Sequence, residues 1–396
     1  MKNQLPQDVL ALGTARSVIR ELFEFGKARG AQIGEENVFD FSIGNPSVPA
    51  PACVAEAAAD LLRGDPVSLH GYTSAQGDAY VREVLAGELN ARFGTAYSAG
   101  DLYLSMGAAA ALCCCFKALT CPGDEFIVLA PYFPEYEVFL ANAGAKMKVV
   151  PAQTEDFQID FAALEAAIGP HTKGVVVNSP NNPSGIVYSR ETCRRLADLL
   201  EVKSRELDHT IWLISDEPYR EIVYDGVTTP WLPDYYRDTL VCYSYSKSLS
   251  LPGERLGYVL VPPACTDAAL VYAAVCGAGR SLGYVCAPSL FQKVAARCAG
   301  QTADLSVYAA NRRLLLDSLR GMGFHCVEPE GAFYLFPRTL IADDVAFCEK
   351  AKEFDLLLVP GSGFGCAGHM RISYCVAPER IRRALPAFER LAAFFQ

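Results

Sequence analysis

Short apolar runs alternate with helical patterns through the middle of the chain, and this alternation restricts what the chain can fold into. The runs lie at residues 101–105, 126–130, 147–151, 174–178, 211–215, 240–244 and 256–261. Their residues are often β-branched and apolar at consecutive positions, which is typical of strands covered on both faces. Helical patterns, such as residues 190–206, separate several of the runs. The pattern therefore predicts an α/β fold with a mostly parallel central sheet.

The C-terminal part has a different order of elements and predicts a second, smaller α+β domain. Its patterns indicate helices at 308–323, 345–354 and 378–395 and strands at 331–337, 355–361 and 370–375. We expect the first residues to join this part, because they precede the first loop with candidate catalytic residues. The prediction is a large domain at 46–285 and a small domain formed by 1–45 and 286–396.

Composition and charge narrow the class of protein. Of the 396 residues, 51% are hydrophobic and 20% are charged, a balance typical of a globular protein with a core. The net charge is -10 and no basic run is present, so we expect no nucleic-acid partner. The N-terminus is amphipathic and charged, unlike a signal peptide, and no run reaches the roughly 18 apolar residues of a membrane span. We expect a cytoplasmic protein without membrane attachment.

The cysteines do not form a recognisable disulfide or zinc pattern. There are 15 of them, and Cys113, Cys114 and Cys115 are consecutive in a predicted buried helix, where adjacent side chains point apart. The others are scattered through apolar segments, without paired C-x-x-C motifs at zinc-finger spacing. This distribution favours small buried thiols in a reducing cytosol and predicts no metal site.

Polar loops follow several predicted strands, at the sheet edge where α/β proteins bind ligands. After residues 101–105, Gly107 allows a tight turn and Ala108 begins a helix whose free N–H groups can hold a phosphate. After residues 174–178 comes SPNNPSG, in which the following proline forces Asn182 toward an extended conformation and aims its amide. The alternatives are an ordinary strand-to-helix turn and a loop rich in turn-forming residues.

Two further loops carry charged groups. Asp216 ends the run at 211–215, where a carboxylate is poorly solvated unless it meets a cation, and Tyr219 lies three residues on. The alternative for Asp216 is a helix N-cap. Lys247 follows the run at 240–244 and can form a Schiff base with an aldehyde once it loses its proton. Arg255, eight residues later, offers a planar fork for phosphate oxygens.

Together these loops supply the groups that pyridoxal 5′-phosphate (PLP) requires. They offer a helix N-terminus, Ser244 and Arg255 for the phosphate, Asp216 for the pyridinium nitrogen, Tyr219 and Asn182 for the phenolic oxygen, and Lys247 for the aldehyde, with a further hydroxyl from Ser246. Because the loops occur in one chain, we interpret them as one PLP site.

Four motifs give the chain a resemblance to a known family. They are NSPNNPSG, SDEPY, S-x-S-K with an arginine eight residues on, and MRISY near the end. With them, essentially the whole chain resembles the fold-type I, PLP-dependent aminotransferases of class I and II, of the aspartate aminotransferase type. The resemblance implies a homodimer with active sites at the subunit interface.

The resemblance also implies roles for individual residues. Lys247 resembles the cofactor-bearing lysine, and Arg371 the arginine that holds the substrate α-carboxylate with help from the backbone of Gly44. Phe133 is similar to the aromatic residue stacked on the ring, with Tyr132 as the alternative. The remaining implied roles are Asp216 on the ring nitrogen, Asn182 and Tyr219 on the ring hydroxyl, Gly107, Ala108, Ala109, Ser244, Ser246 and Arg255 in the phosphate site, and Tyr72 reaching the phosphate of the other subunit.

The expected reaction exchanges an amino group between an L-amino acid and a 2-oxo acid. L-Aspartate with 2-oxoglutarate is the first expectation, although Ala109 replaces a lysine that some aspartate-using relatives carry there. Arg280 is a candidate substitute from the partner subunit, or else a solvated interface arginine. The alternatives are an aromatic amino acid aminotransferase and a PLP-dependent C–S β-lyase. A non-catalytic PLP-fold module is disfavoured by intact Lys247, Asp216 and Arg371.

Overall fold

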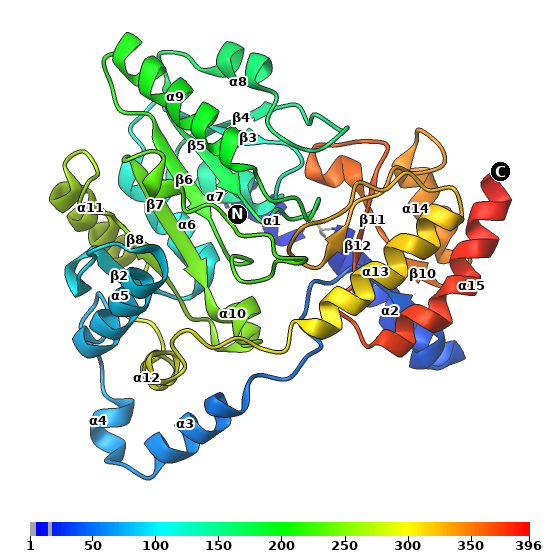
Figure 1. Ribbon diagram of the computed structural model, residues 1–396, viewed down its shortest axis with the longest axis horizontal. Helices are drawn as coiled ribbons and strands as arrows, with labels where there is room; N and C mark the ends of the chain where they lie inside the picture. The colour runs from blue at the N-terminus through cyan, green and yellow to red at the C-terminus, as the bar shows by residue number, and fades with distance from the viewer. Residues whose placement is uncertain (1–4, 15–17) are drawn as a thin grey trace.

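A seven-stranded sheet forms the centre of the larger part of the protein (Figure 1). The computed structural model describes residues 5–14 and 18–396. The order across the sheet is β2-β8-β7-β6-β5-β3-β4. The strands are β2 (Leu102–Ser105), β3 (Glu125–Leu129), β4 (Lys146–Val150), β5 (Thr172–Asn178), β6 (Trp212–Asp216), β7 (Thr239–Ser244) and β8 (Gly257–Leu260). All seven predicted runs are therefore strands, within one or two residues at each end.

Strand direction follows the length of the connections. Strands β4, β3, β5, β6 and β7 pair in parallel, as predicted. Strand β8 is antiparallel to both β7 and β2. Only the short helices α10 (Tyr245–Ser248) and η4 (Pro252–Glu254) lie between β7 and β8. This connection, residues 245–256, contains no helix of ordinary length that could carry the chain back across the sheet to a parallel position, so the chain returns antiparallel.

Helices cover both faces of the sheet, which explains why consecutive strand residues are apolar. On one face, Val176 packs in a cluster with helices α6 (Gly107–Leu119), α7 (Glu135–Ala143) and α11 (Ala268–Ser281). On the other face, Val175 and Val177 pack with α8 (Phe161–Ala167) and α9 (Arg190–Glu206). Since neighbouring strand residues point to opposite faces, a sheet with two covered faces requires apolar residues at both.

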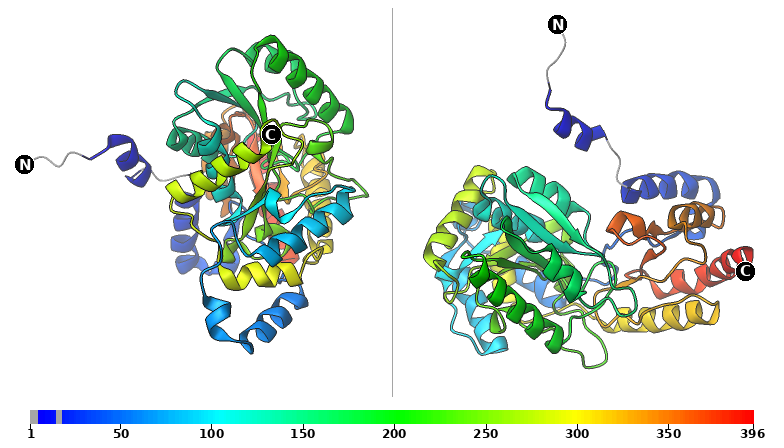
Figure 2. Two further views of the ribbon diagram at one scale, coloured as in Figure 1. Left: turned by 90° about the vertical axis from the view of Figure 1, so that its left-hand side faces the viewer. Right: turned by 90° about the horizontal axis from the view of Figure 1, so that it is seen from above.

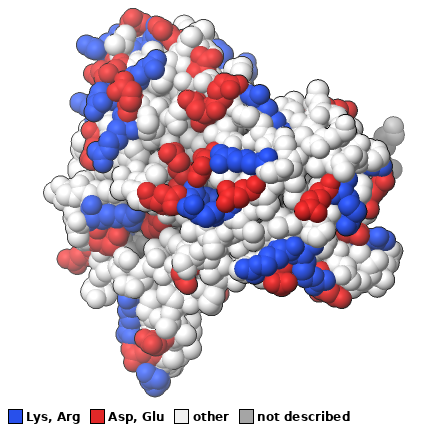
Figure 3. All heavy atoms as spheres, turned by 45° about the vertical axis from the view of Figure 1, so that its right-hand side comes forward, with Lys and Arg blue, Asp and Glu red and all other residues white. Residues whose placement is uncertain are grey.

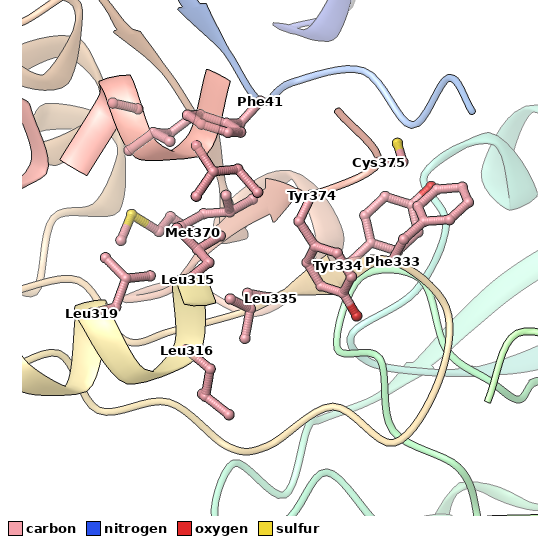
Figure 4. Close-up of a cluster of buried hydrophobic side chains, with 14 of the residues drawn as sticks. Phe41, Leu315, Leu316, Leu319, Phe333, Tyr334, Leu335, Met370, Tyr374 and Cys375 are labelled. Atoms are coloured by element: carbon pink, nitrogen blue, oxygen red, sulfur yellow. The ribbon is translucent and has the colours of Figure 1, made fainter. Parts of the chain in front are cut away.

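The C-terminal part forms a second core beside short strands. Strands β11 (Val359–Pro360), β12 (Met370–Ser373) and β9 (Tyr334–Leu335) are antiparallel, and β1 (Phe39–Asp40) pairs in parallel with β10 (Leu356–Leu357). The helices are α13 (Ser306–Gly321), α14 (Asp344–Lys352) and α15 (Pro378–Phe395). Figure 4 shows Phe41 and Met370 in this core, together with leucines of α13. The pairing of β1 with β10 places part of the N-terminal segment here.

The remaining helices complete the chain. They are α1 (Gln7–Thr14), α2 (Val18–Ile33), α3 (Ala52–Leu62), α4 (Pro66–His70), α5 (Ala79–Phe93) and α12 (Ser289–Arg297), with short 3₁₀ helices η1 (Glu35–Asn37), η2 (Ala99–Asp101), η3 (Leu232–Asp234) and η5 (Gly361–Phe364). Helix α1 has no buried residue and lies away from the rest of the chain (Figure 2). Over the described residues, no helix is both long and apolar enough to cross a membrane.

The predicted domain boundaries stay predictions. Val294 of α12 packs in one cluster with Val54 of α3 and Leu85 of α5, whereas the chain from Ala303 onward packs in the C-terminal core with Phe41. This packing favours a boundary near residue 300 rather than 285. Residues 1–4 and 15–17 of the predicted small domain lie outside the described residues.

The surface carries charges of both signs close together. On the face in Figure 3, acidic and basic side chains alternate rather than forming one large area of a single sign. Ion pairs such as Arg338 with Glu155, at 2.7 Å, are part of this pattern. Exposed pairs of this kind contribute little to stability, on the order of 0–1 kcal/mol each.

Candidate active site

A cavity of about 280 Å³ lies where the carboxyl ends of the central parallel strands meet the smaller part of the chain. Twelve of the predicted site residues line it: Gly44, Ala108, Ala109, Phe133, Asn182, Asp216, Tyr219, Ser244, Ser246, Lys247, Arg255 and Arg371. They come from loops far apart in the sequence, and the strand order of the sheet brings the loops together. The lining does not include Gly107, Tyr72, Arg280 or the alternative Tyr132.

Lys247 lies on the short helix α10, directly after β7. Its Nζ donates a hydrogen bond to the carbonyl oxygen of Gly44 at 2.6 Å. The pKa of Lys247 is lowered to about 8, mainly by burial; the charges of Arg255 and Arg371 act in the same direction, and Cys375 opposes them. A lysine with such a pKa has a substantial neutral fraction near pH 8, so it can attack an aldehyde.

The carbonyl group that Lys247 contacts belongs to Gly44, whose backbone lies close against Tyr334. A Cβ atom on Gly44 would lie 2.2 Å from the Tyr334 hydroxyl oxygen, so only glycine fits against this ring. The Tyr334 hydroxyl is also 2.7 Å from the hydroxyl of Tyr219. Burial raises the pKa of Tyr219, which keeps its phenol protonated as a hydrogen-bond donor.

Asp216 ends strand β6 and is buried against the cavity. Its Oδ2 accepts a hydrogen bond from the Tyr136 hydroxyl at 2.6 Å, whereas its Oδ1 is buried without a hydrogen-bond partner in the described part of the chain. Burial raises the pKa of Asp216 to about 7, the Tyr136 bond opposes this rise, and the charge of Glu217 adds to it. An unpartnered buried acceptor costs about 1–3 kcal/mol, and a protonated ring nitrogen would remove that penalty.

Tyr136 and Asn178 belong to the site but were not predicted. Asn178 Nδ2 donates to the backbone oxygen of Asp216 at 2.8 Å, and its Oδ1 accepts from the backbone N–H of Asn182 at 2.7 Å. Asn178 ends strand β5, so the strand-end rule alone could have identified it. Tyr136 comes from helix α7, 80 residues before its partner in sequence, and no local pattern indicates the contact.

Arg371, on strand β12, is a buried cation without a carboxylate partner among the described residues. Its Nη1 donates to Asn182 Oδ1 at 3.1 Å, its Nη2 donates to the Ser42 carbonyl, and its Nε has no partner. The rings of Tyr334 and Phe364 each have their centroid 4.9 Å from its Cζ. Burial lowers the pKa of Arg371, which shows that its charge is poorly solvated. A small-molecule carboxylate would complete this arrangement.

The N-terminus of α6 and Arg255 form an anion cradle. Gly107 adopts φ of 80°, and a Cβ atom there would lie 3.0 Å from Arg255 Nη2, so glycine lets the arginine approach the first turn of the helix. Ala108 and Ala109, whose N–H groups are free in this first turn, line the same cavity as Ser244. This set of donors fits a phosphate.

These groups fit PLP. The unpartnered Asp216 Oδ1 would accept from the ring nitrogen, the anion cradle would hold the phosphate, and the Lys247 amine would bind the aldehyde. Phe133 lines the cavity, in agreement with stacking on the ring, whereas Tyr132 packs toward Gly365, where a Cβ atom would lie 2.5 Å from its ring. The individual roles remain proposals.

Selection among substrate side chains depends on the other residues that line the cavity. Its apolar residues include Ile19, Leu112 and Phe133, and its lysine and arginine residues are limited to Lys247, Arg255 and Arg371 in the described lining. Arg280 is exposed at the end of α11, and Tyr72 is 98% exposed. The predicted contacts of Tyr72 and Arg280 therefore need a second chain.

Comparison with known proteins gives one consistent family. The model of the family "Aminotransferase class I and II" matches residues 36–388. The chain is 31% identical to the aspartate/prephenate aminotransferase of Thermus thermophilus, over 88% of this chain and 89% of that protein. It is 32% identical to the aspartate aminotransferase of Thermotoga maritima, over 89% of this chain and 91% of that protein.

Solved structures agree with the sequence comparison. An amino transferase from Eubacterium rectale is 58% identical, with a TM-score of 0.98 and coverage of 100% of both chains. The aspartate aminotransferase from Thermus thermophilus with maleate is 28% identical, with a TM-score of 0.86 over 98% of this chain and 100% of that chain. The fold-class prediction is thereby confirmed.

Proposed function

The chain belongs to the class I and II aminotransferases, enzymes that depend on PLP, and we propose that it transfers the amino group of L-aspartate to 2-oxoglutarate. The observation that carries the chemistry is the set of three incompletely partnered groups around one cavity. They are the Lys247 amine with its lowered pKa, the buried Asp216 Oδ1, and the Arg371 guanidinium without a carboxylate.

In the proposed amino transfer, each of these residues has a separate role. When bound, PLP supplies an electron-withdrawing ring that acidifies the substrate Cα–H bond. Asp216 holds the proton on the ring nitrogen, and the hydrogen bond from Tyr136 favours the ionised carboxylate that this requires. Lys247 Nζ is the base that removes the Cα proton. Arg371 grips the α-carboxylate and fixes which bond of Cα is broken.

Two observations bear on the amino donor. The names of relatives favour aspartate, since the matched proteins of Thermus and Thermotoga are aspartate aminotransferases. In this proposal Arg280 of the partner subunit pairs with the side-chain carboxylate, because the lysine and arginine residues of the described lining are already assigned. The apolar residues Ile19 and Leu112 favour an aromatic donor as the second candidate, and one relative is an aromatic-amino-acid aminotransferase.

We also propose a cytoplasmic homodimer with shared active sites. Its support is Tyr72, which is 98% exposed in the single chain although tyrosine usually buries most of its ring. In the dimer, this phenol would reach the phosphate site of the partner. The domain assignment, with a boundary near residue 300, belongs to the same proposal.

A donor screen tests the proposed reaction. The holoenzyme is mixed with single L-amino acids without acceptor, and the change in cofactor absorbance is followed at one donor concentration. Aspartate should react fastest and should form glutamate when 2-oxoglutarate is added. A faster reaction with an aromatic donor would replace aspartate by the second candidate. Release of pyruvate and ammonia from a thioether amino acid, without amino transfer, would indicate a C–S β-lyase instead.

A further inference from the structure

A second cavity, of about 800 Å³, lies outside the catalytic site. Its walls come from the C-terminal part of α5, Arg190 at the start of α9, the segment after β6, the aromatic residues of β7, α10 and β8, and the segment after α12. Thr228 and Gln301 are exposed at its rim, whereas Trp231 and Tyr243 are buried in its wall. The two cavities share no lining residue, so this one is a separate space.

A buried arginine with a free donor lines this second cavity. The side chain of Arg220 is 2% exposed, and its Nε pairs with Glu217 Oε2 at 2.5 Å. Its Nη1 donates to the Tyr258 hydroxyl at 2.9 Å, while its Nη2 is buried without a hydrogen-bond partner in the described chain. A buried donor in this state costs free energy, which an oxygen atom of a ligand would recover.

Two more polar groups of the cavity lack partners within the described residues. Tyr245 is only 8% exposed, yet its hydroxyl makes no hydrogen bond there. Glu88, on α5, is partly buried and makes neither a hydrogen bond nor an ion pair with the described chain. Burial raises the pKa of Glu88, and the charges of Arg92 and Arg220 oppose that rise. An acceptor for the Tyr245 hydroxyl and a cation for Glu88 are therefore missing.

Aromatic rings form much of the remaining wall. Phe93 and Trp231 stack with ring centroids 4.1 Å apart, and Tyr243 and Tyr258 stack at 4.9 Å. The guanidinium carbon of Arg220 lies 4.5 Å from the centroid of Tyr243. Flat rings beside polar groups suit a ligand that is aromatic at one end and charged at the other.

We propose that this cavity binds an aromatic amino acid as a zwitterion. Its carboxylate lies against Arg220 and Tyr245, its ammonium group against Glu88, and its ring against Phe93 and Trp231. The charge balance of the cavity supports a zwitterion over a simple anion, because its lining carries three basic and three acidic side chains, which are Arg92, Arg190, Arg220, Glu88, Glu221 and Asp234. The site does not depend on which amino acid is the donor in the proposed reaction.

Calorimetric titration tests this site directly. The holoenzyme is first reduced with borohydride, so that Lys247 can no longer exchange its cofactor for an added amino acid. L-Phenylalanine is the probe, and it should bind once per chain. 3-Phenylpropionate, which lacks the ammonium group, and phenethylamine, which lacks the carboxylate, should bind at least about tenfold more weakly, the scale of a lost charge-assisted hydrogen bond.

Two variants then locate the bound probe. Glu88→Gln should weaken phenylalanine binding about tenfold, and Tyr245→Phe about fivefold, because each removes one proposed contact without removing bulk. Glu83→Gln is the matched control, since Glu83 is an exposed residue of the same helix and lines neither cavity. Absence of binding heat overturns the proposal, and so does wild-type affinity in Glu88→Gln, which would place phenylalanine elsewhere.

Discussion

Replacement of Arg371 by lysine tests how much the bidentate guanidinium group contributes to binding of the substrate α-carboxylate. A guanidinium has five N–H donors, and Arg371 uses one each for Asn182 and Ser42, which leaves three, including the unpartnered Nε. Two of these suffice for a bidentate bond to the substrate α-carboxylate. Lysine keeps the charge but reaches the carboxylate with a single bond at best, so the variant should lose one charge-assisted hydrogen bond.

The size of the loss follows from that count. One charge-assisted hydrogen bond contributes about 1.5–3 kcal/mol, which corresponds to a fall of roughly 10- to 150-fold in kcat/KM for the amino acid. We expect most of the change in KM, because the α-carboxylate is held in both ground and transition states. The cofactor absorbance should stay unchanged, because Arg371 lies apart from the anion cradle in the proposed binding mode.

The assay compares wild type, Arg371→Lys and the control Arg338→Lys under steady-state conditions. Arg338 is a suitable control because it pairs with Glu155 at the surface and lines neither cavity. The reasoning fails if Arg371→Lys changes kcat/KM less than about threefold. It also fails if wild type converts the corresponding decarboxylated amine as well as the amino acid, since the carboxylate would then make no productive contact.

Further outcomes follow from the same site. The pKa of Lys247 lies at about 8, so cofactor-free enzyme should recombine with PLP faster as pH rises toward that value; a rate independent of pH between about pH 6 and pH 9 would contradict this. Borohydride should fix the cofactor on the peptide that contains Lys247, and Lys247→Ala should lose nearly all turnover, whereas a label on another peptide would refute the assignment. Asp216→Ala should reduce kcat by several orders of magnitude, and near-normal activity would remove its role on the ring nitrogen. Arg280→Ala should lower kcat/KM for aspartate by about 1.5–3 kcal/mol and change an aromatic donor much less; equal losses would mean that Arg280 supports the interface.

Much of the sheet could be predicted from the sequence, because its central strands, such as β5 and β6, are apolar on both faces. Strand direction was harder to predict, since β8 has the same apolar pattern as the parallel strands of the sheet although it runs antiparallel to β7. The direction of β8 follows instead from the connection before it, which contains no helix of ordinary length. Helix α12 illustrates a second limit, because no local pattern indicates that Val294 packs in one cluster with Leu85 of α5.

The site likewise contains some residues that local sequence patterns identify and others whose contacts depend on how distant elements pack. Asp216 and Lys247 stand at strand ends, where a ligand edge is expected, and both line the cavity. Tyr136 reaches Asp216 from a helix on one face of the sheet, so its contact depends on how α7 packs. The placement of Tyr72 and Arg280 depends on a surface that a single chain does not contain.

The cavity walls also bear on how such an enzyme changes over evolution. Ala109 and Ile19 line the cavity with apolar side chains that make no hydrogen bonds, whereas Asp216, Asn182 and Arg371 are joined through bonded neighbours. A substitution at Ala109 or Ile19 therefore breaks no polar network and leaves the groups proposed to act in catalysis in place. We therefore expect single substitutions at these two positions to change the preferred amino donor during evolution. We expect substitutions at the hydrogen-bonded residues to be selected against, because they would disrupt the groups proposed to act in catalysis.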